Sequence, residues 1–328
     1  MKNAISIILS LAMLLPVLAF GQEPVPTNRY GMKLDRNSDG TYSLQKEKRY
    51  AKILNLAEVP GLLEPYTYVK DKLDSKLYKQ TQTEDVVYKT HDGYELKMAI
   101  DKAVTEKPSP VMIFIHGGGW ARGSYDSARS LSKYLAQQNG ITGVRIQYTL
   151  APQPGADVQV SIADVMDAVK FLKAHAAEYN IDPSRIGFLG SSAGAHLAAV
   201  AAMKCPVTKV LVGYSGIYDL TTAAITTRTK DPERIAYFGG LDEKYLAEAS
   251  PVALIPKKKP IAAQLYCGTG DITVEYTQSE EFAAALKRHK ANVELLVYQY
   301  YDHGLNSKGS DKMEEIFFKT AAFIAENL

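Results

Sequence analysis

The sequence predicts an α/β protein built on a mostly parallel, doubly wound sheet. From Val86 onward, short apolar segments alternate with helical stretches, the pattern of a sheet covered by helices on both faces. The stretch near 158–179 repeats apolar residues at intervals of three and four, as a helix with one buried face does. With 328 residues, 46% of them hydrophobic and 23% charged, the chain has ample material for one large domain of this kind.

The first residues resemble an export signal rather than part of the fold. Met1–Asn3 is short and basic, Ile5–Phe20 is apolar, and Ala19 and Gly21 are small residues at the −3 and −1 positions of a cleavage site before Gln22. The apolar run is short for a membrane span, and no cysteine near the cut could take a lipid. We expect a signal peptide at 1–21, no membrane anchor, and a mature protein that is periplasmic or secreted.

Residues 22–82 are charged and poorly periodic, so they predict a leader that packs on a catalytic domain spanning 83–328. Within the leader, Asp35–Gly40 resembles the first half of a calcium-binding EF-hand loop. The twelfth position of that loop is Lys46, where a calcium site needs a bidentate glutamate. A simple Asp-Gly turn is therefore favoured over a Ca²⁺ site.

Eight strands and several helices are expected in the catalytic domain. An antiparallel pair at 86–89 and 95–100 precedes six strands near 111–115, 142–148, 186–190, 209–214, 261–267 and 293–298. On the helix near 158–179, Asp164 and Asp167 fall off the apolar face and are expected to be solvated or to cap a loop. The segment 219–250, which carries Tyr237 and Phe238, is expected to form a small lid or wall.

The string Gly190-Ser191-Ser192-Ala193-Gly194 follows an apolar strand and precedes a helix rich in alanine. A serine nucleophile must stand clear of its neighbours where a base can reach it, and a sharp strand-to-helix turn achieves this. Gly190 and Gly194 have no Cβ atoms to collide across such a bend. Ser192 is the candidate nucleophile, although the pattern alone also suits an ordinary glycine-rich helix entry.

Upstream, the apolar run Val111–Ile115 opens into the glycine-rich string His116–Trp120. Successive glycines after a strand leave backbone N–H groups uncovered, and such donors stabilise the oxyanion that forms in acyl transfer. We assign this role to the N–H groups of Gly118, Gly119 and Ala193. The alternatives are a phosphate-binding loop or a plain turn, but no Gly-Lys-Ser/Thr follows the glycines.

Downstream, the chain supplies an acid and a base. The strand at 261–267 ends near Asp271, and His303 lies in a loop before the last helix. The chain order serine, aspartate, histidine is one of three known triad orders. Asp302 and Glu275 are alternative acids, but Asp271 is preferred because it lies at the carboxyl end of a strand, where open α/β sheets collect their sites.

Four segments together resemble landmarks of α/β-hydrolase esterases and lipases, near the hormone-sensitive-lipase-like and the acetyl and feruloyl esterase groups. They are HGGGW at 116–120, YTLAP at 148–152, GSSAGAHLA at 190–198 and SGIYDL at 215–220. Ser191 stands where hormone-sensitive-lipase relatives usually carry an acid, and 194–196 is more similar to feruloyl and acetyl esterases and arylformamidases. The resemblance covers most of 86–328 and implies an α/β-hydrolase fold with a serine carboxylester hydrolase activity.

The resemblance narrows the substrate only by class. Acetyl or feruloyl groups on polysaccharide or small esters are favoured, and the alternative is amide cleavage by an arylformamidase-like or peptidase-like enzyme. A non-enzymatic binding protein of this shape is disfavoured, because no catalytic group is missing. Trp120, Tyr125 and Tyr218, with Tyr148 and Tyr214, fall where they could line a pocket, but tyrosines at strand ends more often pack with a solvated hydroxyl.

No cofactor is needed for this chemistry, and no metal-binding motif such as H-E-x-x-H or C-x-x-C is present. The net charge of +2 and the single run Lys257–Lys259 make nucleic acid an unsuitable partner. Cys205 and Cys267 are expected at opposite ends of the sheet and therefore unpaired. His116 and His196 are expected to support the two glycine motifs by hydrogen bonding. The sequence makes no prediction about oligomeric state.

Overall fold

A computed structural model describes residues 34–36, 42–44, 81–222, 229–307 and 312–328. Its main sheet has eight strands in the order β10-β9-β8-β7-β5-β6-β4-β3. The strands are β3 (Thr83–His91), β4 (Tyr94–Asp101), β5 (Ser109–Ile115), β6 (Thr142–Ile146), β7 (Ile181–Ser191), β8 (Thr208–Tyr214), β9 (Ala262–Gly268) and β10 (Asn292–Tyr298). β4 runs antiparallel to both β3 and β6, and the other pairs are parallel. The predicted eight-stranded, mostly parallel sheet is therefore confirmed.

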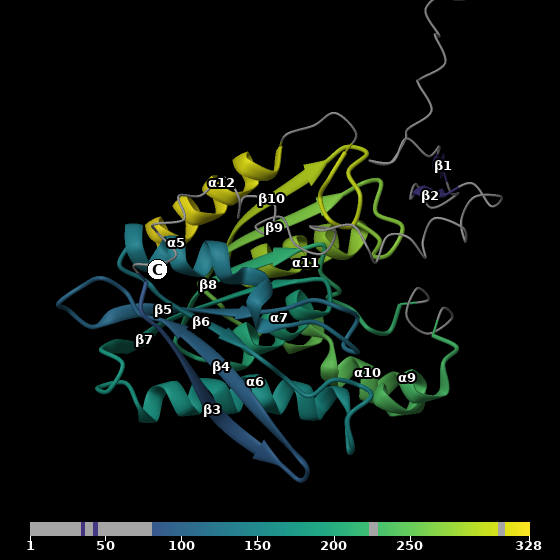
Figure 1. Ribbon diagram of the computed structural model, residues 1–328. Coiled ribbons are helices and arrows are strands. Elements are labelled where there is room, and N and C mark those ends of the chain that lie inside the picture. Colours follow the sequence, from purple (N-terminus) through teal and green to yellow (C-terminus); the bar gives the residue numbers. More distant parts are fainter. Residues whose placement is uncertain (1–33, 37–41, 45–80, 223–228, 308–311) are drawn as a thin grey trace, which may run out of the picture.

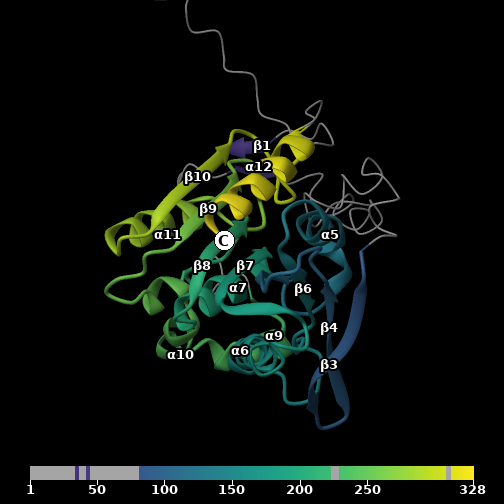
Figure 2. The same ribbon diagram turned by 90° about the vertical axis from the view of Figure 1, so that its left-hand side faces the viewer.

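Helices cover both faces of this sheet (Figure 1). α5 (Arg129–Gln138) and α12 (Lys312–Asn327) lie on one face, and α6 (Val158–Ala174), α7 (Ala193–Lys204) and α11 (Thr277–Arg288) lie on the other. Side chains alternate along a strand, so Met112 and Phe114 of β5 join the core beneath α5 and α12, whereas Val111, Ile113 and Ile115 join the opposite core. Figure 2 shows the sheet from a second side, with β10 at one edge and β3 at the other.

α6 ends earlier than the sequence predicts. It begins at Val158, after the N-cap Asp157 whose side chain accepts a hydrogen bond from the Gln159 N–H, but it stops at Ala174 instead of continuing to about 179. The next residues form turns that end at Asn180, whose φ of 52° reverses the chain into β7. The chain has to turn there because Ile181 pairs with Ser109 at the start of β5.

A buried ion pair links the neighbouring strands β4 and β6. Asp101 accepts a hydrogen bond from Nε of Arg145 at 2.8 Å, and the two side chains are 0% and 2% exposed. The hydroxyls of Thr83 and Ser132 donate to the same carboxylate at 2.6 and 2.5 Å. These donors compensate for the burial of the charge.

The segment predicted as a lid or wall forms short helices at one end of the sheet. They are α9 (Pro232–Tyr237), η5 (Gly239–Leu241) and α10 (Glu243–Ala249), and η6 (Pro251–Leu254) follows the segment. Residues 223–228 of the segment lie outside the described residues. Tyr237 and Phe238 are buried, and the hydroxyl of Tyr237 lies 2.7 Å from Oγ of Ser161 on α6. The described part therefore packs on the domain as a fixed wall.

Little of the N-terminal segment is described. β1 (Leu34–Arg36) and β2 (Tyr42–Leu44) pair antiparallel, with Arg36 opposite Tyr42, as expected for a turn between them. The turn itself, the predicted signal peptide and the rest of the predicted leader up to residue 80 lie outside the described residues. Among the described residues, no helix is long and apolar enough to cross a membrane. Cys205 and Cys267 are both buried and neither forms a disulfide.

Candidate active site

Ser192 occupies the sharp turn between β7 and α7. Its φ of 54° and ψ of −122° are an unusual backbone conformation for a residue with a side chain. The turn is as tight as the sequence predicts, because a Cβ on Gly190 would lie 2.2 Å from the carbonyl oxygen of Gly194. A Cβ on Gly194 would in turn lie 2.1 Å from the carbonyl oxygen of Ile115. The two glycines thus bring the start of α7 against the ends of β7 and β5.

Three side chains far apart in the sequence form one chain of hydrogen bonds. Oγ of Ser192 lies 2.9 Å from Nε2 of His303, and Nδ1 of His303 lies 2.7 Å from Oδ2 of Asp271. A carboxylate can only accept, so Nδ1 carries the proton and Nε2 is left to accept from the serine hydroxyl. The histidine side chain is 19% exposed and the aspartate side chain 1%. The arrangement has a base facing the hydroxyl and a carboxylate fixing the tautomer of the base.

The backbone holds the acid in place. Oδ1 of Asp271 accepts hydrogen bonds from the N–H groups of Thr273 and Val274 at 2.8 and 2.9 Å, which leaves Oδ2 for His303. The alternative acid, Asp302, is used differently, because its Oδ1 accepts from the N–H groups of Gly304 and Asn306. Asp302 therefore shapes the loop that carries His303, and Asp271 rather than Glu275 lies against Nδ1.

The glycine-rich loop after β5 lies beside the serine. A Cβ on Gly117 would lie 3.4 Å from Cβ of Ser192. Gly118 and Gly119 have φ values of 116° and 63°, which turn this loop back over the end of the sheet. The N–H groups of Gly118, Gly119 and Ala193 donate to no acceptor within the part of the chain that the structure describes. These are the three donors that the sequence assigns to an oxyanion.

A second loop, 147–157, braces this one. The Tyr148 hydroxyl donates to the His116 carbonyl at 3.1 Å, and its ring stacks on the His116 ring at 4.5 Å. The Ala151 N–H donates to the Trp120 carbonyl at 2.7 Å. His116 also bonds the Gly117 carbonyl through Nδ1, as expected of a loop-supporting histidine.

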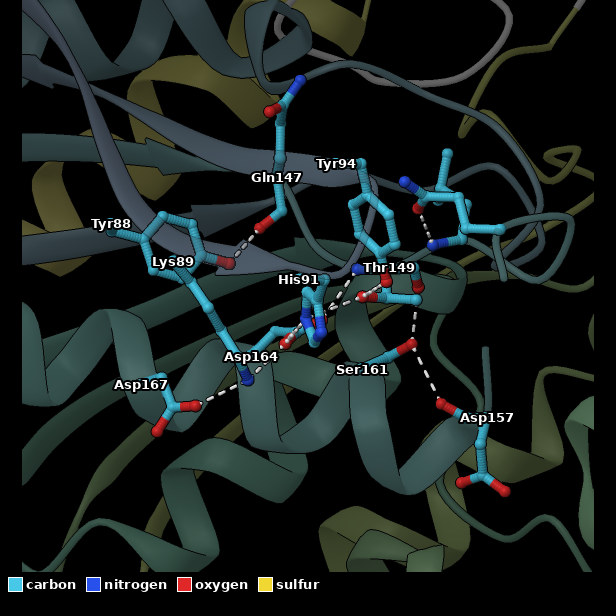
Figure 3. A network of polar contacts seen from close by, with 12 residues as sticks. Tyr88, Lys89, His91, Tyr94, Gln147, Thr149, Asp157, Ser161, Asp164 and Asp167 are labelled. Atoms are coloured by element: carbon cyan, nitrogen blue, oxygen red, sulfur yellow. Dashed lines mark hydrogen bonds and ion pairs between the residues drawn. The ribbon is translucent and has the colours of Figure 1, made fainter. Parts of the chain in front are cut away.

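Asp164 fixes the bracing loop from below (Figure 3). Its carboxylate accepts from the Thr149 N–H at 2.9 Å, from Lys89 Nζ at 2.7 Å and from His91 Nε2 at 2.8 Å. Its side chain is 0% exposed. Of the two roles that the sequence allowed, the solvated one is wrong for Asp164 and the loop-capping one is confirmed, because Thr149 lies in the loop that supports Trp120. Asp167, at 30% exposed, pairs with Lys89 and Lys170.

The aromatic residues predicted to line a pocket mostly pack in the core. Trp120 is 2% exposed, lies edge-on to Phe238, and donates through Nε1 to Nδ1 of His196 at 3.3 Å. Tyr218 is 1% exposed and stacks on Phe282 of α11, with ring centroids 4.3 Å apart. The pocket-wall prediction is wrong for these two rings, because the helices of 229–250 and α11 cover them. Tyr148 and Tyr214, each 1% exposed, are core residues as well.

The structure does not bring Tyr125 to the serine either. Its hydroxyl donates to Asp85 of edge strand β3 at 3.2 Å, and its ring lies 5.8 Å from the guanidinium of Arg145. It lines a polar cleft at that edge with Asp126, Arg129 and Lys133. Arg234 of α9 does reach the glycine-rich loop. The sequence does not predict this, because a lone arginine on a short helix carries no periodic or motif signal.

Three histidines, the partly buried His303 and the buried His116 and His196, differ in their tendency to bind a proton. Burial opposes protonation of His303, but the charge and hydrogen bond of Asp271, aided by the charge of Asp302, outweigh it and raise its pKa above 6.5. Burial lowers the pKa of His116 and of His196 to about 4. The pKa of His303 is therefore shifted upward, opposite to the pKa shifts of His116 and His196. Within the described ranges, no three histidine, cysteine, aspartate or glutamate side chains gather as metal ligands would.

Comparison with solved structures identifies the fold. The apo form of esterase 2 from Thermogutta terrifontis superposes with a TM-score of 0.64 and 25% identity, covering 74% of this chain and 94% of that one. The same esterase phosphorylated by paraoxon gives a TM-score of 0.62 at 24% identity, with the same coverage. These likenesses identify the fold as the α/β-hydrolase fold, as the sequence predicts.

Curated relatives match over shorter ranges. A probable isoprenylcysteine alpha-carbonyl methylesterase of Oryza sativa subsp. japonica is 29% identical over 219 residues, 60% of this chain and 52% of that protein. An acetyl esterase of Salmonella schwarzengrund is 31% identical over 117 residues, 34% of this chain and 36% of that protein. The chain thus spans about half the length, or less, of the curated relatives that it matches.

One family model matches the centre of the catalytic region. The BD-FAE model covers residues 98–286, which is more than half of the 328 residues. That range includes the glycine-rich loop, Ser192 and Asp271, and it ends before His303. The chain belongs to the BD-FAE family.

Proposed function

We propose that this protein is a serine carboxylester hydrolase in which Ser192 is the nucleophile, His303 the general base and acid, and Asp271 the orienting carboxylate. One observation carries the proposal: the hydrogen bonds of 2.9 and 2.7 Å that link serine, histidine and aspartate without a break. The relatives described above, by sequence and by fold, are named esterases, which supports the same reaction class.

In the first half-reaction, Oγ of Ser192 attacks the ester carbonyl carbon while Nε2 of His303 takes the hydroxyl proton. The carbonyl electrons move onto oxygen, and the N–H groups of Gly118, Gly119 and Ala193 donate to that oxyanion. Collapse of the tetrahedral intermediate breaks the bond to the alcohol oxygen, which takes the proton from His303. The products are the free alcohol and an acyl group on Ser192.

In the second half-reaction, water attacks the acyl-serine carbonyl and gives its proton to His303. The second tetrahedral intermediate uses the same three N–H donors, and its collapse returns the proton to Oγ of Ser192. Throughout, Asp271 holds the proton-bearing Nδ1 of His303 and stabilises the imidazolium. The net reaction consumes one water and releases a carboxylic acid.

For the substrate we propose a short acyl group, acetyl above all, on a polysaccharide or a small ester, with feruloyl as the longer alternative. One of the matched relatives, the acetyl esterase, is named for the removal of a short acyl group. The burial of Trp120 and Tyr218 also favours a small acyl group, because neither ring is open to stack on a feruloyl ring.

Site-directed variants test the mechanism. Ser192→Ala is expected to lower hydrolysis of p-nitrophenyl acetate by roughly 10⁴- to 10⁶-fold with the fold intact, as removal of a triad nucleophile does. Ser191→Ala, one residue earlier, is the matched control and is expected to lose less than about tenfold. Paraoxon should add mass to a peptide containing Ser192 in the wild type and not in Ser192→Ala. Retained activity in Ser192→Ala would show that the nucleophile is another group.

A substrate panel tests the acyl class. Rates on p-nitrophenyl acetate, butyrate and longer esters, acetylated xylan, methyl ferulate and N-formylkynurenine are compared at equal enzyme concentration. We expect acetyl esters to give the highest kcat/KM. A preference for N-formylkynurenine would instead favour the amide hydrolase alternative.

A further inference from the structure

Arg234 extends from α9 to the glycine-rich loop. A Cβ on Gly119 would lie 3.4 Å from Nη2 of Arg234 and 4.0 Å from its Cζ. The same guanidinium lies 5.6 Å from the centre of the Trp120 ring, and that ring is fixed by its hydrogen bond to His196. A positive charge is thus held beside one of the three N–H donors proposed for the oxyanion.

This guanidinium has no polar partner within the described ranges. Its Nε is buried and makes no hydrogen bond, and the structure records no hydrogen bond or ion pair of its side chain. The two acids nearest in sequence, Asp231 and Glu233, are exposed, and the Asp231 carboxylate accepts the backbone N–H of Arg234 at 3.1 Å as the cap of α9. An arginine carries five N–H donors in a fixed fork, and leaving them unpaired in a partly buried place is costly.

A second arginine adds to the positive charge here. Arg122 follows the glycine-rich loop and is exposed. Cγ of Arg122 would lie 3.1 Å from a Cβ on Gly118, so this side chain lies against the same loop. Burial lowers the pKa of Arg234, Asp231 and Tyr237 oppose this, and the positive charge of Arg122 lowers it further. Two arginines beside one loop, of which Arg234 has no hydrogen-bonded or ion-paired carboxylate among the described residues, form a site for an anion.

We propose that Arg234, with Arg122, binds a carboxylate carried by the substrate ester. This inference rests on the proposed ester hydrolase function and specifies its substrate class. The planar guanidinium matches a carboxylate with two parallel hydrogen bonds, and Trp120 keeps it in position before the substrate arrives. Because the charge lies next to Gly119, the carboxylate belongs to a part of the ester close to the scissile carbonyl, in either the acyl or the alcohol group.

Two pairs of esters test the proposal and distinguish these two positions. 4-Acetoxybenzoate and 4-acetoxybenzamide differ in charge on the alcohol side, and 4-methylumbelliferyl succinate and butyrate differ in charge on the acyl side. In the wild type, kcat/KM for the anionic member of at least one pair should exceed that of its neutral twin. Arg234→Gln is expected to lower this anionic-to-neutral ratio by about 10- to 100-fold. Arg234→Lys should restore part of it.

Arg288→Gln is the matched control, because it removes an exposed arginine at the end of α11 and should leave the ratio unchanged. Raising the ionic strength should lower the wild-type ratio more than that of Arg234→Gln. If Arg234→Gln does not fold, Arg122→Gln on the exposed loop tests the same site and should lower the same ratio.

Two outcomes would overturn the proposal. One is a wild type without preference for either anionic ester. The other is an equal loss on the charged and neutral members of a pair in Arg234→Gln, which would give Arg234 a role in the fold or at the oxyanion instead. Both differ from failure of the proposed function itself, in which the wild type would hydrolyse none of the four esters and no p-nitrophenyl acetate.

Discussion

Nδ1 of His303 lies 2.7 Å from Oδ2 of Asp271, 32 residues earlier in the chain, and not against its own neighbour Asp302. The two carboxylates have different roles. Asp271 is buried and faces the imidazole, whereas Asp302 accepts the N–H groups of Gly304 and Asn306 and thereby fixes the backbone around His303. This division gives the first prediction.

Asp271→Asn should lower kcat by about 10³- to 10⁴-fold, because the amide no longer fixes the tautomer of His303 or stabilises its cation. It should also move the acidic limb of the pH profile. The rate requires neutral His303, so in the wild type it rises as pH passes a pKa that Asp271 holds above 6.5. Without that charge, burial dominates and the pKa falls, so the limb moves to lower pH. Profiles of kcat/KM from pH 4 to 9 on p-nitrophenyl acetate measure the shift.

Asp302→Asn is the control for this prediction. The charge of Asp302 contributes least to the raised pKa of His303. The acidic limb of the pH profile of Asp302→Asn should therefore move in the same direction as that of Asp271→Asn, by a smaller amount. A larger shift, or a larger loss of kcat, in Asp302→Asn than in Asp271→Asn would identify Asp302 as the orienting acid.

Ser192→Gly should fold more stably than Ser192→Ala. The φ of 54° and ψ of −122° cost about 1 to 3 kcal/mol for a residue with a Cβ, and glycine adopts them without strain. Glycine loses about 0.5 to 1 kcal/mol more entropy on folding, so a net difference of about 1 kcal/mol remains. Urea unfolding measures it. At Ser191, an ordinary strand residue of β7, the alanine variant should instead be more stable than the glycine variant. A more stable glycine variant at both positions would show that the turn at Ser192 is unstrained.

The protein should lose stability in acid because two histidines are buried in neutral form. Nδ1 of His196 must accept from Trp120 and Nε2–H must donate to the Ala249 carbonyl, so only the neutral ring fits. Burial lowers the pKa of His196 to about 4, while the unfolded chain binds a proton near 6.5. The contribution of His196 to the free energy of unfolding is therefore fully present above pH 6.5 and decreases by about 3 kcal/mol as the pH falls to 4.

Urea unfolding of His196→Gln between pH 8 and 4 measures this contribution. The variant should be less stable at pH 8, but the slope of its stability against pH should be smaller by up to about 1.4 kcal/mol per pH unit, the value for one proton. An unchanged slope would show that His196 does not resist protonation in the folded state.

The buried pair Asp101–Arg145 should be strongly coupled. Asp101→Ala removes the acceptor of Nε of the buried Arg145, which keeps only its Nη1 contacts to Asp126 and the Tyr125 carbonyl, and should cost about 3 to 5 kcal/mol of unfolding free energy. Arg145→Met should cost a similar amount, and the double variant much less than the sum. The partly exposed pair Arg185–Asp182 serves as the reference and should couple by less than about 1 kcal/mol. Equal coupling in the two pairs would contradict the prediction.

The sheet was predictable because its strands are local features. An apolar β-rich run such as 111–115 needs no knowledge of distant residues, and the order serine, aspartate, histidine then places Ser192, Asp271 and His303 at one edge. What lies above or below that edge depends on tertiary packing. The burial of Trp120 and Tyr218 follows from helices far along the chain. The full burial of Asp164 on α6 depends on Lys89 and His91, which reach it from strand β3.

The loops that carry Asp271 and His303 are bound to each other more closely than to the serine. Thr269 N–H donates to the Tyr298 carbonyl and Gly270 N–H to the Tyr301 carbonyl, each at 3.0 Å, across the adjacent strands β9 and β10. Ser192 belongs to β7, with β8 between. Mechanically the triad has two parts, an acid–base unit and a separate nucleophile. Spreading of the sheet would lengthen the contact between Ser192 and His303 first. We therefore expect heating to abolish hydrolytic activity while His303 is still bonded to Asp271 and the chain is still folded.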